Sequence, residues 1–112
     1  MLRDEFKVMP KNVRVASGET ALMECAPPRG YPEPIISWKR NGEKIKTGFG
    51  RFRIVNTGNL EISDVRPGDE GRYTCIAENM VGIRESPPAH LTVQGKLHFT
   101  IIRSYDFFFS YN

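Results

Sequence analysis

Short segments in which apolar and polar side chains alternate recur along the chain, and turn residues separate them. The alternating segments are residues 13–15, 21–25, 36–38, 52–55, 60–62, 73–77 and 91–93. A period of two is typical of a half-buried β-strand, and a series of such strands at short spacing is typical of a β-sandwich or barrel. Prolines are scattered from Pro10 to Pro88 and interrupt any helical period. The pattern therefore predicts an all-β fold.

Two turn segments add detail to this prediction. Asn41-Gly42 favours a two-residue hairpin, because a type I′ turn needs positive φ at both central residues. The proline-rich stretch from Pro27 to Pro34 is either a preorganised loop for partner contact or a rigid turn at one end of the sandwich. Tyr31, at its centre, is correspondingly either an exposed anchor or a side chain that packs onto the domain.

The spacing of four residues limits the choice of all-β folds. Cys25 and Cys75 both fall on the inward phase of a predicted strand, Trp38 follows Cys25, and Tyr73 precedes Cys75 by two residues. A disulfide between the two cysteines would indicate an oxidising compartment. The alternative is a pair of unrelated thiols in a cytosolic β-protein, which leaves the tryptophan and tyrosine spacings unexplained.

This constellation, with Asp69-x-Gly71-x-Tyr73-x-Cys75 at its end, resembles an immunoglobulin domain, and the short third-to-fourth strand spacing resembles the I-set. The resemblance implies an all-β sandwich of two antiparallel sheets joined by one disulfide, Cys25–Cys75. It also implies a structural set in which Arg51 pairs with Asp69. The expected structural residues are Trp38, Leu60, Tyr73, Arg51 and Asp69.

A closer resemblance lies in longer strings of sequence. The string from Pro27 to Trp38, Pro-Pro-Arg-Gly-Tyr-Pro-Glu-Pro-Ile-Ile-Ser-Trp, and the segment from Glu78 to Gly82 are similar to the second immunoglobulin domain of Roundabout receptors. The resemblance implies a module of the extracellular part of a plasma-membrane receptor in axon guidance. Its implied partners are a Slit-type secreted ligand, heparan sulfate and neighbouring immunoglobulin domains. Alternatives are a homophilic adhesion or spacer module, or a receptor fragment without function.

The resemblance divides the chain in two. Residues 1–94 are expected to form the immunoglobulin domain, and residues 95–112 resemble nothing in the family. We expect this aromatic-rich tail to be disordered, a short isoform, or translated non-coding sequence. The first residues lack the apolar core of a signal peptide, so we expect the chain to be a piece of a longer protein.

Basic residues are the candidate binding groups in a chain whose net charge is +3. Extended sulfated polymers bind such surfaces through many screened charge contacts. The alternative is a solvated polar face, in which Glu24, Glu43 and Glu61 neutralise nearby cations. On the predicted hairpin we expect Glu43 alone to oppose the cations, and we place Arg29 in the loop that follows the second core strand. The candidate residues are Lys39, Arg40, Lys44 and Lys46 on the hairpin, with Arg14, Arg29 and Arg53 elsewhere.

The remaining chemistry argues against an enzyme. His90 and His98 have no metal-ligand spacing, and the cysteines are assigned to the disulfide, so we expect no catalytic residue, no metal and no cofactor. We also expect no nucleic-acid partner and no membrane contact by this segment. Ile76 and Met80 are predicted to be outward apolar positions near the last hairpin.

Overall fold

The computed structural model describes residues 1–95, 98–99 and 109–110. The prediction about the tail therefore lies almost entirely outside the described residues. The strands are β1 (Leu2–Val8), β2 (Val13–Ala16), β3 (Ala21–Met23), β4 (Ala26–Gly30), β5 (Ile35–Arg40), β6 (Glu43–Lys44), β7 (Phe52–Val55), β8 (Asn59–Ile62), β9 (Gly71–Asn79), β10 (Gly82–Glu85), β11 (Ala89–Gln94), β12 (His98–Phe99) and β13 (Phe109–Ser110). A single 3₁₀ turn, η1 (Pro67–Asp69), lies between β8 and β9.

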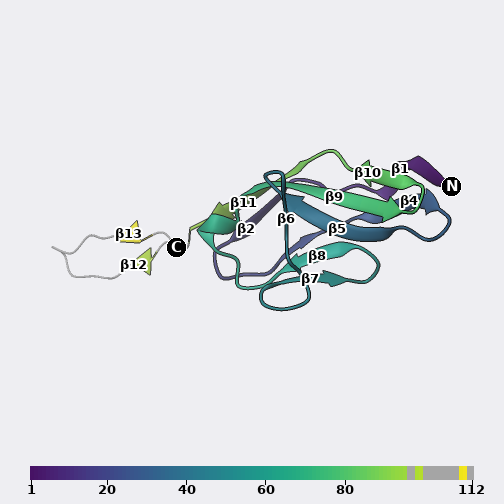
Figure 1. The fold of residues 1–112 in the computed structure, drawn as a ribbon. Coiled ribbons are helices and arrows are strands. Elements are labelled where there is room, and N and C mark those ends of the chain that lie inside the picture. The colour runs from purple at the N-terminus through teal and green to yellow at the C-terminus, as the bar shows by residue number, and fades with distance from the viewer. Residues whose placement is uncertain (96–97, 100–108, 111–112) are drawn as a thin grey trace.

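The strands form two facing layers (Figure 1). The larger sheet has the order β2-β11-β9-β5-β6, and β10 also pairs with β9. The facing layer contains β3-β8-β7, and β4, which follows β3 along the chain, pairs with β1. The predicted immunoglobulin-like sandwich is thereby confirmed. One pairing departs from the antiparallel rule, because β2 runs parallel to β11.

The core lies between the layers and follows the predicted alternation. In β3, Ala21 and Met23 are buried while Leu22 is exposed, and in β8 both Leu60 and Ile62 are buried. Burial of such side chains supplies about 1.5–3 kcal/mol each, which is what holds the sheets face to face. The buried core cluster consists of Ala21, Met23, Cys25, Ile36, Trp38, Leu60, Ile62, Val65, Tyr73, Cys75, Ala77, Ala89 and Leu91.

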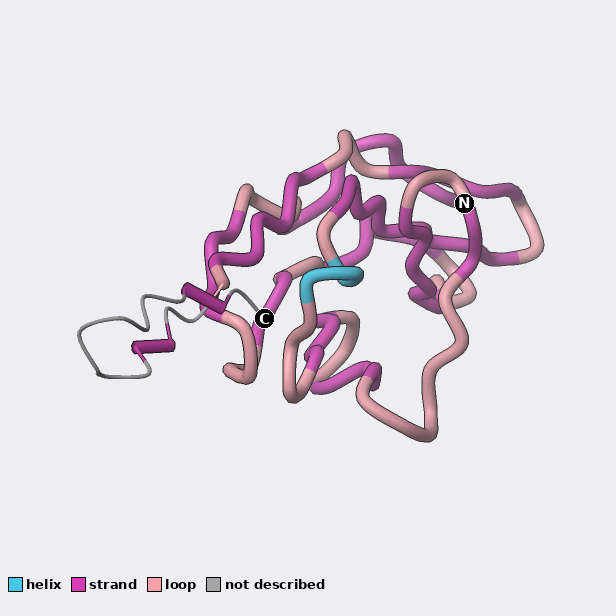
Figure 2. Tube along the Cα trace, turned by 90° about the vertical axis from the view of Figure 1, so that its left-hand side faces the viewer, coloured by secondary structure: helices cyan, strands magenta, loops and turns pink. Residues whose placement is uncertain are grey.

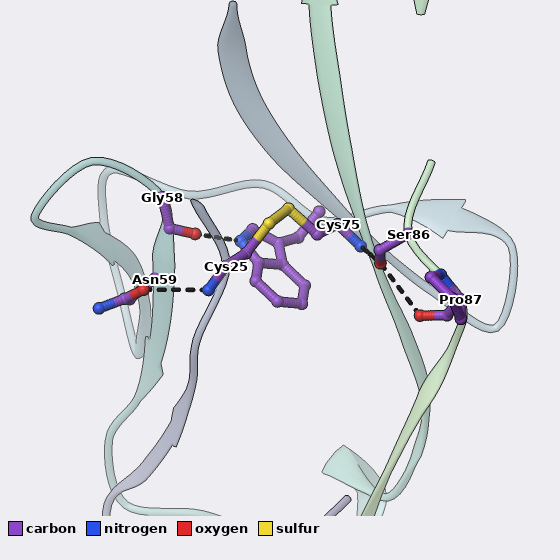
Figure 3. The surroundings of a disulfide bond; sticks show 7 residues. Cys25, Gly58, Asn59, Cys75, Ser86 and Pro87 are labelled. Atoms are coloured by element: carbon purple, nitrogen blue, oxygen red, sulfur yellow. Dashed lines mark hydrogen bonds between the residues drawn. A yellow bond between two sulfur atoms is a disulfide. The ribbon is translucent and has the colours of Figure 1, made fainter. Parts of the chain in front are cut away.

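The Cys25–Cys75 disulfide crosses this core and links the two layers (Figure 3). Trp38 is directly opposite Cys75 in the β5–β9 pairing, so indole and disulfide share the inner face. The indole N–H donates a hydrogen bond of 2.9 Å to the Gly58 carbonyl oxygen. A Cβ atom on Gly58 would lie 2.7 Å from the Cys25 carbonyl oxygen, so this approach requires glycine.

The corner between β8 and β9 is built around η1, which is cyan in Figure 2. The Tyr73 hydroxyl donates a hydrogen bond to the Asp69 carbonyl oxygen, and the Asp69 carboxylate accepts one from the Arg66 N–H at 2.8 Å. Both Asp69 and Tyr73 are buried. This corner is therefore closed by side chains as well as by backbone.

The predicted hairpin is present between β5 and β6. Asn41 has a φ of 49° and Gly42 a φ of 85°, which is the positive pair that a type I′ turn requires. The turn places Lys39 opposite Lys44 and Arg40 opposite Glu43. The Asn41 side chain accepts a hydrogen bond of 2.9 Å from the Arg72 N–H and so ties the tip of the hairpin to β9.

Candidate functional site

An open cavity of about 420 Å³ lies against the hairpin. We call it the basic groove, because Arg40, Lys44 and Lys46 line it. Arg40 ends β5, Lys44 ends β6, and Lys46 follows two residues later, so one short hairpin supplies all three cations. The other lining residues are Asn41, Glu43, Ile45 and Phe52.

The three cations of the basic groove differ in how far they are neutralised. Arg40 lies 3.6 Å from an Asp69 carboxylate oxygen, and its guanidinium stands 5.9 Å from the centre of the Phe52 ring. Lys44 and Lys46 are exposed, and neither has a carboxylate within ion-pair distance in the described part of the chain. The two lysines are the groove's available positive charges.

Lys39 is not one of the groove's available cations, because it forms an ion pair that the sequence does not predict. Its Nζ lies 3.1 Å from a carboxylate oxygen of Glu85 on β10. The expectation that Glu43 alone opposes the hairpin cations is therefore wrong. The reason is tertiary: β10 and β5 flank β9 on opposite sides, so this ion pair reaches across β9.

The other predicted basic residues lie on separate surfaces. Arg53 on β7 is paired with Glu61, its neighbour on β8, at 2.6 Å. Arg14 lies on β2 beside Thr92 of β11. Arg29 lies in β4 and not in a loop, because β4 continues to Gly30 through its pairing with β1. The structure therefore unites Arg40, Lys44 and Lys46 but not the complete predicted set.

Arg51 and Asp69 form a second cluster of charge at the corner. The Arg51 guanidinium donates two hydrogen bonds to the Asp69 carboxylate, at 2.7 and 3.0 Å. Burial by itself would raise the pKa of Asp69, but the Arg51 hydrogen bond, the Arg66 N–H and the charge of Arg40 together hold that pKa below its usual value. The same pair raises the pKa of Arg51, chiefly through the Asp69 hydrogen bond. This arrangement stabilises the fold.

Exposed apolar side chains gather at the end of the sandwich where β1 begins. Ile35 and Ile83 flank Glu78 in the sheet and are 76% and 53% exposed, and Met80 and Tyr31 are 85% and 78% exposed. We call Tyr31, Ile35, Met80 and Ile83 the apolar end. Sequence reasoning missed Ile35 and Ile83, although Ile35 stands on the phase opposite to the buried Ile36.

Ile76 is a correction to the sequence prediction. It was expected at an outward apolar position that an interface could use, but it is only 5% exposed. Ile76 lies between Ser37 of β5 and Glu85 of β10, and the ion pair between Lys39 and Glu85 crosses the same face. Neighbouring side chains thus cover it.

Among residues 1–95 and the two short later strands, no cluster of three or more His, Cys, Asp or Glu side chains has a geometry that could hold a metal ion. No helix in the described part of the chain has the length and apolar character needed to cross a membrane.

Comparisons with known proteins agree with this architecture. The model of the immunoglobulin I-set domain family matches residues 4–93. The chain therefore belongs to the immunoglobulin I-set family.

The chain is homologous to Roundabout proteins in particular. It is 50% identical to human Roundabout homolog 2 over 93 residues and 44% identical to Protein sax-3 of Caenorhabditis elegans over 100 residues. These matches cover 83% and 88% of this chain but only 7% and 8% of those proteins. The chain thus spans less than a tenth of the length of these two relatives.

Solved structures show the same fold. The tandem Ig repeats of Dlar match with a TM-score of 0.74 and 32% identity, over 80% of this chain and 46% of that one. The titin M3 domain matches with a TM-score of 0.71 and 30% identity, over 83% of this chain and 98% of that one. The fold is thus found both as a single domain and within tandem arrays.

Proposed function

We propose that this chain is an extracellular immunoglobulin module of a Roundabout-type cell-surface receptor. In this role it assists the recognition of a Slit-type ligand and heparan sulfate in axon guidance. The homology to Roundabout homolog 2 and Protein sax-3 supports the receptor assignment. The observation that carries the binding role is the basic groove, where Arg40, Lys44 and Lys46 line one open cavity.

The groove suits a sulfated polymer for electrostatic reasons. Lys44 and Lys46 are exposed and lack carboxylate partners in the part of the chain that the structure describes, so bound sulfates would not have to displace an existing ion pair. Arg40, directly before the turn of the hairpin, adds a forked donor. Each contact is weak in water, and several together give a salt-dependent affinity.

Binding to immobilised heparan sulfate across a salt series tests the proposal. We expect the wild-type chain to bind at low salt and to dissociate as salt rises. The Lys44→Glu/Lys46→Glu variant should lose most of this binding, because both available cations of the groove become anions. Surface plasmon resonance at matched protein concentration measures both.

A charge-matched variant provides the control. Lys7→Glu/Lys11→Glu has the same net charge as the groove variant but changes lysines outside the groove lining, and both of these side chains are exposed. We expect it to retain most of the binding. Equal losses in both variants would show that only net charge matters, and no binding by the wild type would refute the heparan sulfate role.

The apolar end supports a second candidate function, that of an adhesion or spacer module contacting a neighbouring immunoglobulin domain. Exposed side chains such as Ile35, Met80 and Ile83, gathered at one end, are unusual for an isolated domain. The first strand also starts there, held by Arg84, which donates hydrogen bonds to Asp4 at 2.7 Å and to the Leu2 carbonyl at 3.1 Å. A domain joined through β1 would lie against this surface.

Sedimentation velocity separates the two forms of this second function. A dimer that grows with concentration and is abolished by Ile35→Lys/Ile83→Lys would indicate homophilic adhesion. A wild-type monomer at all concentrations would exclude homophilic adhesion and leave the spacer form. The Leu22→Lys variant, an exposed apolar position on the opposite sheet, is the control.

A further inference from the structure

An exposed phenylalanine lies beside the basic groove. Phe49 is 73% exposed and stands between Gly48 and Gly50, whose φ angles are 100° and 78°. Positive φ at both neighbours is strained for other residues, so the turn that presents this ring depends on glycine. The turn leads directly into β7, and Phe49 forms an isolated antiparallel bridge with Phe52, a residue that lines the groove.

The bridge places the backbone of Phe49 beside that of a groove residue. Phe52 lines the groove, and so does Lys46, which lies three residues before Phe49 in the chain. Phe49 belongs to the groove's edge, although its side chain is not part of the cavity lining. A large, exposed aromatic side chain therefore lies on the turn that joins two residues of the groove lining, Lys46 and Phe52.

The two phenylalanines of this region have different surroundings. The guanidinium groups of Arg40 and Arg51 stand 5.9 and 5.2 Å from the centre of the Phe52 ring, and Phe52 packs against the core. Phe49 has no such cation over its ring in the described part of the chain, and the core cluster does not include it. Phe49 is therefore the aromatic surface that a ligand can reach.

We propose that Phe49 is a carbohydrate-stacking residue of the basic groove, so that the groove selects sulfated polysaccharides over other polyanions. The proposal rests on the proposed heparan sulfate function and adds a specificity determinant to it. Aromatic rings carry a negative face, on which the C–H groups of a pyranose ring pack favourably. Lys44 and Lys46 attract any polyanion, whereas an exposed ring adds affinity only for a ligand that has an apolar face.

The test compares two polyanions on the full chain. Heparin presents sulfates on pyranose rings, and inorganic polyphosphate presents charge without rings. We expect Phe49→Ala to weaken heparin binding about five- to tenfold, as loss of one stacking contact implies. Its polyphosphate affinity and the salt dependence of both ligands should stay unchanged, because no ionic contact is removed. Isothermal titration calorimetry across a salt series measures each quantity.

Three further variants sharpen the test. Phe49→Trp should bind heparin at least as tightly as the wild type, since an indole offers a larger face. Leu22→Ala, an exposed apolar truncation on β3 and outside the groove lining, should bind both polymers as the wild type does. Lys44→Glu/Lys46→Glu should weaken the binding of both polymers and lower the salt dependence of both affinities.

The outcomes separate the two proposals. If Phe49→Ala binds heparin as tightly as the wild type, the stacking role is overturned while the proposed function stands. If Phe49→Ala loses heparin and polyphosphate equally, the ring acts on the shape of the groove and the stacking role is again overturned. If the wild type binds neither polymer, the proposed function fails and the stacking role falls with it.

Discussion

The corner around Asp69 and the basic groove both contain cationic side chains, but these cations have different roles in the two regions. At the corner, the Arg51 guanidinium is bound to a buried carboxylate by two hydrogen bonds. In the groove, Lys44 and Lys46 are exposed and have no carboxylate partner among the residues that the structure describes. Arg40 belongs to both regions, since it lines the groove and lies 3.6 Å from Asp69.

The difference shows that burial decides what a charge does in this sandwich. A buried carboxylate such as Asp69 has to be paired, and its partners then stabilise the fold. A solvated lysine contributes little to stability and keeps its charge available for a ligand. The predictions below test this division of roles, from the largest effect to the smallest.

The largest effect is expected when the corner loses its carboxylate. Asp69→Ala removes the partner of Arg51 and the acceptor of the Arg66 N–H, and both contacts are partly or fully buried. We expect the free energy of unfolding to fall by about 3 kcal/mol. Urea denaturation followed by Trp38 fluorescence measures it, and a loss below about 0.5 kcal/mol would contradict the structural role of the corner.

The same carboxylate should make stability depend on acid. The pKa of Asp69 is lowered in the folded protein, so its contribution is present above the ordinary aspartate pKa of about 4 and is lost as pH falls through the folded-state value. We expect unfolding free energy to drop between neutral pH and about pH 2, and to drop less in Asp69→Asn. If the free energy of unfolding of the wild type and of Asp69→Asn fell equally with pH, the effect would belong to other carboxylates.

A smaller effect is expected from the tyrosine of the same corner. Tyr73→Phe keeps the buried ring and removes only the hydroxyl that donates to the Asp69 carbonyl oxygen. We expect a loss of about 1 kcal/mol, since the carbonyl is left without this partner. Thermal unfolding by circular dichroism measures the change, and a loss as large as that of Asp69→Ala would mean that the ring had repacked.

The smallest effect on stability is expected in the groove. Lys44→Glu/Lys46→Glu changes two exposed side chains that form no ion pair within the part of the chain that the structure describes. The free energy of unfolding should therefore change by less than about 0.5 kcal/mol. A larger loss would show that these lysines support the fold, and would erase the contrast between groove and corner. The same urea titration used for Asp69→Ala provides the comparison.

Much of the sandwich follows from local sequence rules. The alternation at Ala21, Met23, Leu60 and Ile62 predicts which side chains enter the core, because a strand presents successive side chains to opposite faces. Asn41-Gly42 predicts its hairpin because few residue pairs accept two positive φ angles. These features depend on neighbours in the chain.

The candidate site was less predictable, because pairing partners come from distant positions. Lys39 and Glu85 are separated by 46 residues and meet only because β10 lies beside β9. Arg29 was misplaced because the pairing of β4 with β1 extends that strand. The sequence did not predict a role for Ile35, because single exposed apolar residues are common on protein surfaces.

The sequence by itself determined the class of fold and the inward face of most strands, since these depend on periodicity and on a few residues with unusual packing or backbone needs. Its resemblance to immunoglobulin domains implied the disulfide. The tertiary structure decided which cations of the hairpin are neutralised and which gather in one groove. It did so because ion pairs form across strands whose order in the sheet is not their order in the chain. Lys44, Lys46 and Phe49 are exposed because no other part of the sandwich packs over them.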